Sequence, residues 1–284
     1  MAVTLPRQVK YEVSNATELE ISPEINKRKF LIDFGISTPS SGQYVDIYVG
    51  GSPILRIYEQ LGDCKLIDAI YPVDSILGFW KFLEKHGIKW PLINAAQDQK
   101  LTLKFSEAKT LIEAWILEQK GGDVDSHNLP GGSDATVIPY IFWVTHSSDI
   151  AETKTVSLDK AYAPTGLPKL ADGEYLDRGY RFRLQSIIFA ASKSGSSKPT
   201  RLHIWLGDYE IYSPKEHKGI VVDPDYWNTC KLDVTADRIF VLPDELVIPD
   251  NILIRLLMDV TYDGTNTITK ETLWLGLLGI LERV

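Results

Sequence analysis

Short runs of β-branched and aromatic residues, bounded by Gly, Ser and Pro, recur along most of the chain. Within 180–185 apolar and polar residues alternate strictly, which is typical of a strand with one solvent-facing side. Runs of this kind predict strands at 30–36, 44–49, 54–58, 136–145, 180–191, 201–206, 210–212, 231–234, 246–248, 252–262 and 272–281. The pattern therefore predicts a protein built mainly of short strands.

Two segments of the first half also fit a helix. In the first, Asp74 or Ser75 is suited to cap the N-terminus, apolar residues follow at helical spacing, and Gly87 stands where a left-handed residue ends a helix. The second, 106–119, is ambiguous, because its composition favours a helix and its apolar residues have helical spacing. We predict a helix for the first segment and decide on the second from its counterpart in the other half.

The two halves of the chain follow similar patterns. Segment 32–50 consists of a strand, a loop rich in Ser, Gly and Pro, and a strand ending in Gly, and 187–207 repeats this order. Phe105–Gly121 and Ile248–Gly264 have the same length, and each encloses an apolar run followed by an acidic residue. Because the run in the second stretch has no helix cap, we predict a strand for its counterpart, 111–118. The repeated order predicts a tandem duplication.

These patterns predict an all-β protein with two tandem jelly-roll-type antiparallel β-sandwiches and one short helical insertion in the first. Connections of widely varying length suit a jelly roll better than a simple meander. We place the first sandwich at residues 1–148 and the second at 180–284. Residues 149–179, rich in turn-forming residues, are expected to be a linker and entry segment.

Composition and charge narrow the classes of function. The 284 residues carry 30 basic and 38 acidic side chains, a formal net charge of −8. This deficit of positive charge argues against a nucleic-acid surface and against electrostatic docking on anionic lipid. The first residues of the sequence contain no apolar stretch of signal-peptide length, no apolar run is long enough to span a membrane, and Cys64 and Cys230 are too few for a disulfide scaffold. We therefore expect a protein made in a reducing cytoplasm.

The most suggestive polar cluster is a glycine-rich loop that contains Asp123, Asp125 and Asp134. Two carboxylates at i and i+2 can direct several oxygens at one cation, as calcium requires. The loop lacks the sixth-position glycine and the closing glutamate of an EF-hand, and the alternative is a solvated loop rich in turn formers. These aspartates are candidate calcium ligands, and the sequence suggests no other cofactor.

The sequence contains no complete motif for catalysis or phosphate binding. Its Gly-Gly pairs lack the third glycine or the Lys-Ser/Thr that such motifs need, and its five histidines have no zinc-site spacing. Asp223 and Asp225 beside Trp227 could form a sugar site with a stacking platform, although Asp-Pro more simply starts a turn. We expect no enzymatic activity and no catalytic residue.

In this organisation the chain resembles the viral double jelly-roll major capsid proteins of the adenovirus and tailless membrane-containing bacteriophage lineage. The resemblance rests on chain length, tandem duplication, a helix in the first unit and many strands; it covers nearly the whole chain and includes no diagnostic motif. It implies a structural subunit of a virion, made in the host cytoplasm, that assembles into pseudo-hexagonal trimers and contacts other capsid proteins. Some relatives place an N-terminal amphipathic helix on the viral membrane. Here 8–21 alternates like a strand, which leaves membrane contact open.

Two other functions fit the same fold, because sandwich folds serve many purposes. One is a carbohydrate- or receptor-binding protein, such as a spike or lectin-like domain. The other is a glycan-active enzyme that uses Asp223 and Asp225. The missing secretion signal, disulfides and acid–base clusters favour the capsid subunit.

Overall fold

The computed structural model describes residues 6–61, 64–67, 79–120, 137–191, 194–211, 219–224 and 239–284. Nearly all of its regular structure is β, and the pairs of named strands are antiparallel. The predicted all-β fold of antiparallel sheets is therefore confirmed.

The first half of the chain forms one six-stranded sheet, which we call the first sheet. Its centre is β8 (Leu101–Lys120), and β1 (Arg7–Ile21) pairs with it along most of one side. On the other side, β2 (Lys27–Ile36) pairs with the C-terminal half of β8 and β3 (Tyr44–Val49) with its start. The strand predicted for 111–118 is therefore confirmed. The remaining strands of this region are β4 (Ser52–Tyr58), β7 (Ile93–Ala95) and the short pair β5 (Gln60–Leu61) and β6 (Cys64–Lys65).

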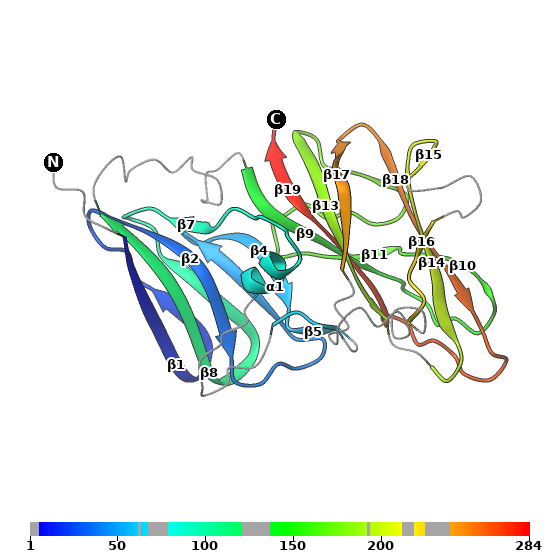
Figure 1. The fold of residues 1–284 in the computed structure, drawn as a ribbon, viewed down its shortest axis with the longest axis horizontal. Coiled ribbons are helices and arrows are strands. Elements are labelled where there is room, and N and C mark those ends of the chain that lie inside the picture. Colours follow the sequence, from blue (N-terminus) through cyan, green and yellow to red (C-terminus); the bar gives the residue numbers. More distant parts are fainter. Residues whose placement is uncertain are drawn as a thin grey trace.

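The second half forms two more sheets, and Figure 1 shows the three sheets one after another along the long axis of the molecule. The central sheet has the order β11 (Lys160–Tyr162), β9 (Val137–Thr145), β19 (Leu273–Arg283), β13 (Tyr180–Ala191) and β17 (Ile239–Pro249). The outer sheet contains β10 (Lys154–Ser157), β12 (Glu174–Tyr175), β14 (Lys198–Leu206), β15 (Tyr209–Glu210), β16 (Ile220–Val221) and β18 (Leu253–Thr261).

Both faces of the central sheet are buried along β9 and β19. Along β9, Tyr140 and Phe142 belong to the core shared with the outer sheet, whereas Ile141 and Trp143 belong to the core shared with the first sheet. Successive residues of a strand point to opposite faces, so a strand between two cores must be apolar at almost every position. This requirement explains the unbroken apolar run in β9 and in β19.

The placement of β9 and of the predicted linker differs from the expected organisation. We assigned β9 to the end of the first sandwich (1–148), but it pairs with β19 and β11 in the central sheet. The expected linker, 149–179, contributes three short strands, and its Leu158 and Leu170 are fully buried in the second core. Its turn-forming residues separate these strands instead of forming a free connection. The division into two sandwiches at these boundaries stays a prediction.

The two segments that suggested duplication take part in different pairings. Strands β2 and β3 lie in one sheet, on the same side of β8. Their counterparts β13 and β14 lie in two different sheets, the central and the outer one. The repeat is therefore a local one of strand, loop and strand, and the tandem duplication also stays a prediction.

One short helix, α1 (Phe79–Lys85), lies within the range predicted to be helical. Phe79 and Trp80 are buried in the core of the first sheet, and Gly87 has the left-handed φ of 75° expected at a helix end. The predicted capping residues, Asp74 and Ser75, lie outside the described residues. No helix in the described part of the chain has the length and apolar character needed to cross a membrane.

Candidate functional site

The predicted calcium ligands are not placed by the structure. Asp123, Asp125 and Asp134 all fall within 121–136, outside the described residues, so calcium binding there stays a prediction. In the described ranges, no group of three or more His, Cys, Asp or Glu side chains is arranged to hold a metal ion.

Only part of the second candidate site is described. Asp223 follows β16, and its Oδ2 lies 2.7 Å from Nζ of Lys198 on β14. Asp225 and Trp227 lie outside the described residues. The observed ion pair gives Asp223 a role in joining β14 to the segment after β16, and its pairing with Asp225 is not tested.

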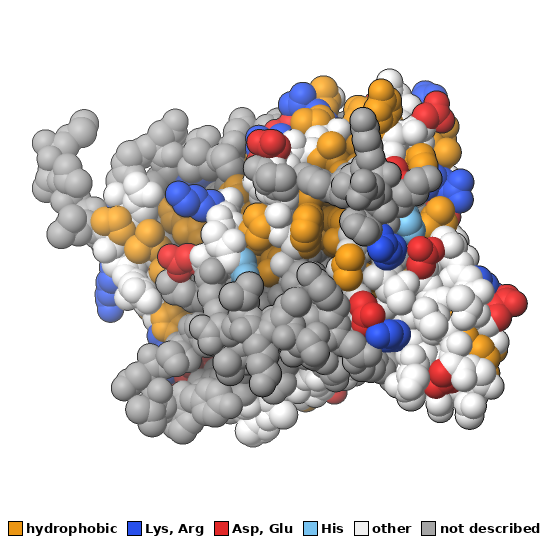
Figure 2. Space-filling view, turned by 45° about the vertical axis from the view of Figure 1, so that its right-hand side comes forward, with side chains coloured by type: hydrophobic (Ala, Val, Ile, Leu, Met, Phe, Trp, Pro, Cys, Tyr) orange, Lys and Arg blue, Asp and Glu red, His pale blue; other side chains and the backbone are white. Residues whose placement is uncertain are grey.

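The central sheet has an apolar strip on its edge strand β17, which pairs only with β13 in the part of the chain that is described. Val241 and Val247 on this strand are 43% and 47% exposed. Glu245, between them in sequence, accepts hydrogen bonds from Arg183 (3.1 Å) and Gln185 (2.5 Å) of β13. Figure 2 shows hydrophobic side chains reaching the surface beside basic and acidic ones. Exposed apolar side chains next to charged ones are a common feature of protein–protein contacts.

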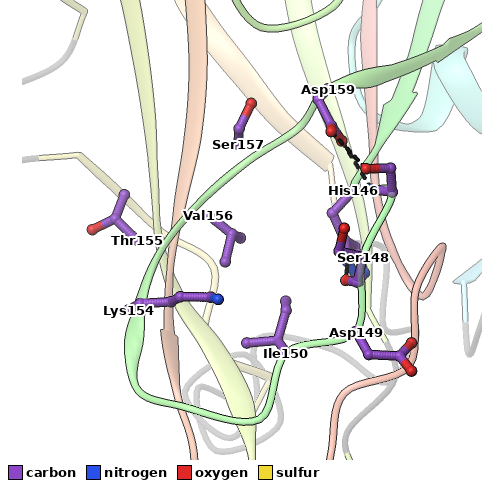
Figure 3. A pocket seen from close by; sticks show the side chains of 10 residues that line it. His146, Ser148, Asp149, Ile150, Lys154, Thr155, Val156, Ser157 and Asp159 are labelled. Carbon is purple, nitrogen blue, oxygen red and sulfur yellow. Dashed lines mark hydrogen bonds between the residues drawn. The ribbon is translucent and has the colours of Figure 1, made fainter.

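A polar pocket of about 280 Å³ lies between the segment after β9 and strand β10 (Figure 3). His146 and Asp159 stand on one side of it and Lys154 on the other, and Ser147 also lines it. These residue types could serve nucleophilic catalysis if the imidazole and the hydroxyl were hydrogen-bonded to each other.

The hydrogen bonds in this pocket do not form such a catalytic arrangement. Ser147 Oγ donates to Asp159 Oδ2 at 2.6 Å, and His146 Nδ1 lies 2.8 Å from the carbonyl oxygen of Ser148. Burial lowers the pKa of His146, and the hydrogen bond to Ser148 opposes this only in part, so the ring is neutral at pH 7. These groups hold the loop after β9 in place, and the Ser147 hydroxyl is bonded to the Asp159 carboxylate instead of to the imidazole of His146.

The outer sheet contains a histidine held between two carboxylates, which the sequence alone did not indicate. His203 Nδ1 on β14 lies 2.5 Å from Glu210 Oε1 on β15, and its Nε2 lies 2.9 Å from Asp259 Oδ2 on β18. Burial alone would lower the pKa of His203, but the hydrogen bonds to Asp259 and Glu210 outweigh it and raise that pKa. The ring thus links three strands, and both carboxylates favour its protonated form.

We expect this cluster to make the protein more stable at mildly acidic than at mildly alkaline pH. Because the pKa of His203 is higher in the folded than in the unfolded chain, its stabilising effect is complete below the unfolded value of 6.5 and is lost as pH rises through the folded value. His203→Gln should lower the free energy of unfolding by about 1.5–3 kcal/mol at pH 5.5, with a smaller loss at pH 8. Thermal unfolding of both proteins across this range measures the difference.

Glu210→Gln is the matched control for this prediction, because it keeps the side-chain shape and removes one of the two charges facing the ring. Its stability should depend on pH less than that of the wild type and more than that of His203→Gln. Parallel stability curves for the wild type and His203→Gln between pH 5.5 and 8 would show that the ring does not titrate in the folded protein.

Comparisons with known proteins identify no family for this chain. No protein-family model and no curated protein sequence matches it. Among solved structures, the fold is similar to that of the major capsid protein P2 from bacteriophage PM2, with a TM-score of 0.42 and 10% sequence identity. That alignment covers 99% of this chain and 93% of the phage protein. Both similarity values are too low to carry a function from one protein to the other.

Proposed function

We propose that this chain is a structural subunit that assembles with copies of itself, as trimers, into the shell of a virus. A shell subunit needs a framework that keeps its shape and surfaces that contact neighbouring copies. One observation supports the proposal most directly, because it meets both needs. The central sheet lies between two buried cores, which gives a rigid framework, and its edge strand β17 has exposed apolar side chains, which offer a contact surface.

The strip on β17 is suited to contact a second copy. Val241 and Val247 are exposed on a strand that has one unpaired side in the described part of the chain, and exposed apolar side chains at a sheet edge are suited to association. Pro243 in the same strand removes one backbone N–H, as edge strands allow, so side-chain packing contributes more to the contact than added strand pairing.

The purified full chain should therefore form a trimer in light scattering, with a mass of 96 kDa for three chains of 32.0 kDa. The double substitution Val241→Glu and Val247→Glu should shift this population to monomers, because it replaces both exposed apolar side chains of the contact with charged ones. Tyr209→Glu is the control, since Tyr209 is 83% exposed on β15, which belongs to the outer sheet and not to the sheet of β17.

A wild-type protein that stays monomeric at high concentration contradicts the proposed assembly. If the trimer persists after the double substitution, the proposed assembly stands, but β17 is not part of its interface. Images of regular particles under assembly conditions would support the shell itself.

A further inference from the structure

A second pocket, of about 460 Å³, lies where the first sheet meets the central sheet. One wall comes from residues 41–61, on and around β3, β4 and β5, and the other from β11 and the start of β19. Its volume is within the usual range for small-molecule sites, about 300–1,000 Å³.

Aromatic rings form a continuous lining in this pocket. The ring centroids of Tyr44 and Tyr58 are 5.8 Å apart, and those of Tyr58 and Trp274 are 5.1 Å apart. Tyr162 extends the row from the central sheet, with its ring centroid 5.2 Å from that of Trp274. Rings of this kind offer flat apolar faces together with polar edges.

Charged groups stand among these rings, and each is paired with an opposite charge. Arg56 donates to both carboxylate oxygens of Asp46, at 2.7 and 2.6 Å, while its guanidinium carbon lies 3.7 Å from the centroid of the Tyr44 ring. Glu271 accepts from Lys160 at 2.5 Å and from the Tyr162 hydroxyl at 2.8 Å. The pocket thus has polar groups fixed in place and no net charge from these pairs, which disfavours phosphate, carboxylate and ammonium ligands.

The backbone at Glu271 gives a separate indication of a functional site. Glu271 has a φ of 60°, a left-handed conformation that glycine and asparagine adopt far more readily than glutamate. Its carbonyl oxygen accepts the indole N–H of Trp274 at 2.7 Å, which holds both residues in position. Strained backbone maintained at the wall of a pocket is a recurrent feature of binding sites.

From these observations we infer that the pocket binds one neutral pyranose unit of a sugar. The C–H face of the sugar stacks on Tyr44 and Tyr162, the two rings of the row that are only partly buried, and its hydroxyl groups bond to Arg56 and Glu271. Residues from both the first and the central sheet contact the sugar, so the bound ligand bridges the two sheets. This inference is independent of the proposed shell, since it requires only the folded chain.

Saturation-transfer NMR and calorimetry on the full chain test the inference with glucose, galactose, mannose, glucuronic acid and a neutral trisaccharide. We expect a neutral hexose to bind with a Kd of about 1 mM and Tyr44→Ala to weaken it about tenfold. Tyr209→Ala is the control, because that tyrosine is exposed and remote from the pocket. Equal affinities for hexose and trisaccharide would support recognition of a single sugar unit.

A second variant keeps the test decisive if Tyr44→Ala fails to fold. Ser41 is exposed at the pocket wall, so Ser41→Trp adds a ring at the entrance without removing any core side chain, and it should abolish sugar binding. Three results would overturn the inference: no neutral sugar binds the wild type, both variants bind as the wild type does, or glucuronic acid binds more tightly than the hexoses.

Discussion

Replacing Lys109 by methionine is expected to lower the free energy of unfolding by about 3–5 kcal/mol at pH 7, because it leaves the Glu59 carboxylate buried without its cation. Nζ of Lys109 donates to Glu59 Oε2 and to Glu107 Oε1, both at 2.6 Å. The side chains of Lys109 and Glu59 are 2% and 0% exposed. Methionine retains most of the apolar length of lysine, so the lost charge dominates. Urea unfolding of both proteins measures the difference.

The loss should shrink as the pH falls. Burial raises the pKa of Glu59 above its ordinary 4.5, and the hydrogen bond from Lys109 opposes that rise. Without Lys109 the pKa of folded Glu59 rises further, so the folded variant binds the proton more readily than the unfolded chain. The variant therefore loses stability as the pH rises from the pKa of Glu59 in the unfolded chain to its higher pKa in the folded chain. It regains that stability when the solution is acidified.

Two further variants test whether the buried charge is the cause. Glu107→Gln removes the half-exposed partner of Lys109 and should cost less than about 1 kcal/mol. The double variant Glu59→Gln and Lys109→Met should be more stable at pH 7 than Lys109→Met alone, because no buried charge remains. An equal loss for Lys109→Met at pH 4.5 and pH 7, without recovery in the double variant, would contradict this account.

The strands could be predicted from the sequence where local pattern and tertiary environment agree. Strands β3 and β13 have the predicted bounds, because their short apolar or alternating runs are bounded by turn residues. Strand β8 is harder, since its Ala, Glu, Lys and Leu residues favour a helix. It is extended because β1 occupies one side and β2 and β3 the other, and this pairing outweighs local propensity.

The arrangement of the sheets could not be predicted in the same way. The apolar run of β9 indicates burial on both faces, but it does not identify the two cores that bury it. The clusters are equally non-local: Asp259 reaches His203 from a strand 56 residues away, and the sugar pocket joins Tyr44 to Trp274. The signals for these sites lie in strand pairing, which a single sequence does not reveal.

Replacing Gly279 by alanine is expected to destabilise the central sheet by about 3 kcal/mol or more. Gly279 lies on β19 between Leu184 of β13 and Tyr140 of β9, where β13 has a bulge. A Cβ added there would lie 2.0 Å from the backbone carbonyl oxygen of Arg183. Backbone at the middle of a five-stranded sheet cannot move aside without breaking hydrogen bonds on both sides of β19, so the cost is at the upper end of that for overpacked cores. Thermal and urea unfolding measure it.

Two glycine variants separate this backbone clash from other effects of adding a methyl group. At Gly276, on the same strand, an added Cβ would meet the ring of Trp143 at 2.7 Å, and a side chain can shift, so Gly276→Ala should cost about 1–3 kcal/mol. Gly264 has open space around it but a φ of 86°, so Gly264→Ala reports conformational strain alone, about 1–2 kcal/mol. If Gly279→Ala proves no more destabilising than Gly264→Ala, the backbone of Arg183 does not lie as close to Gly279 as 2.0 Å from an added Cβ. The strands at the centre of this sheet would then be packed less tightly than the structure shows.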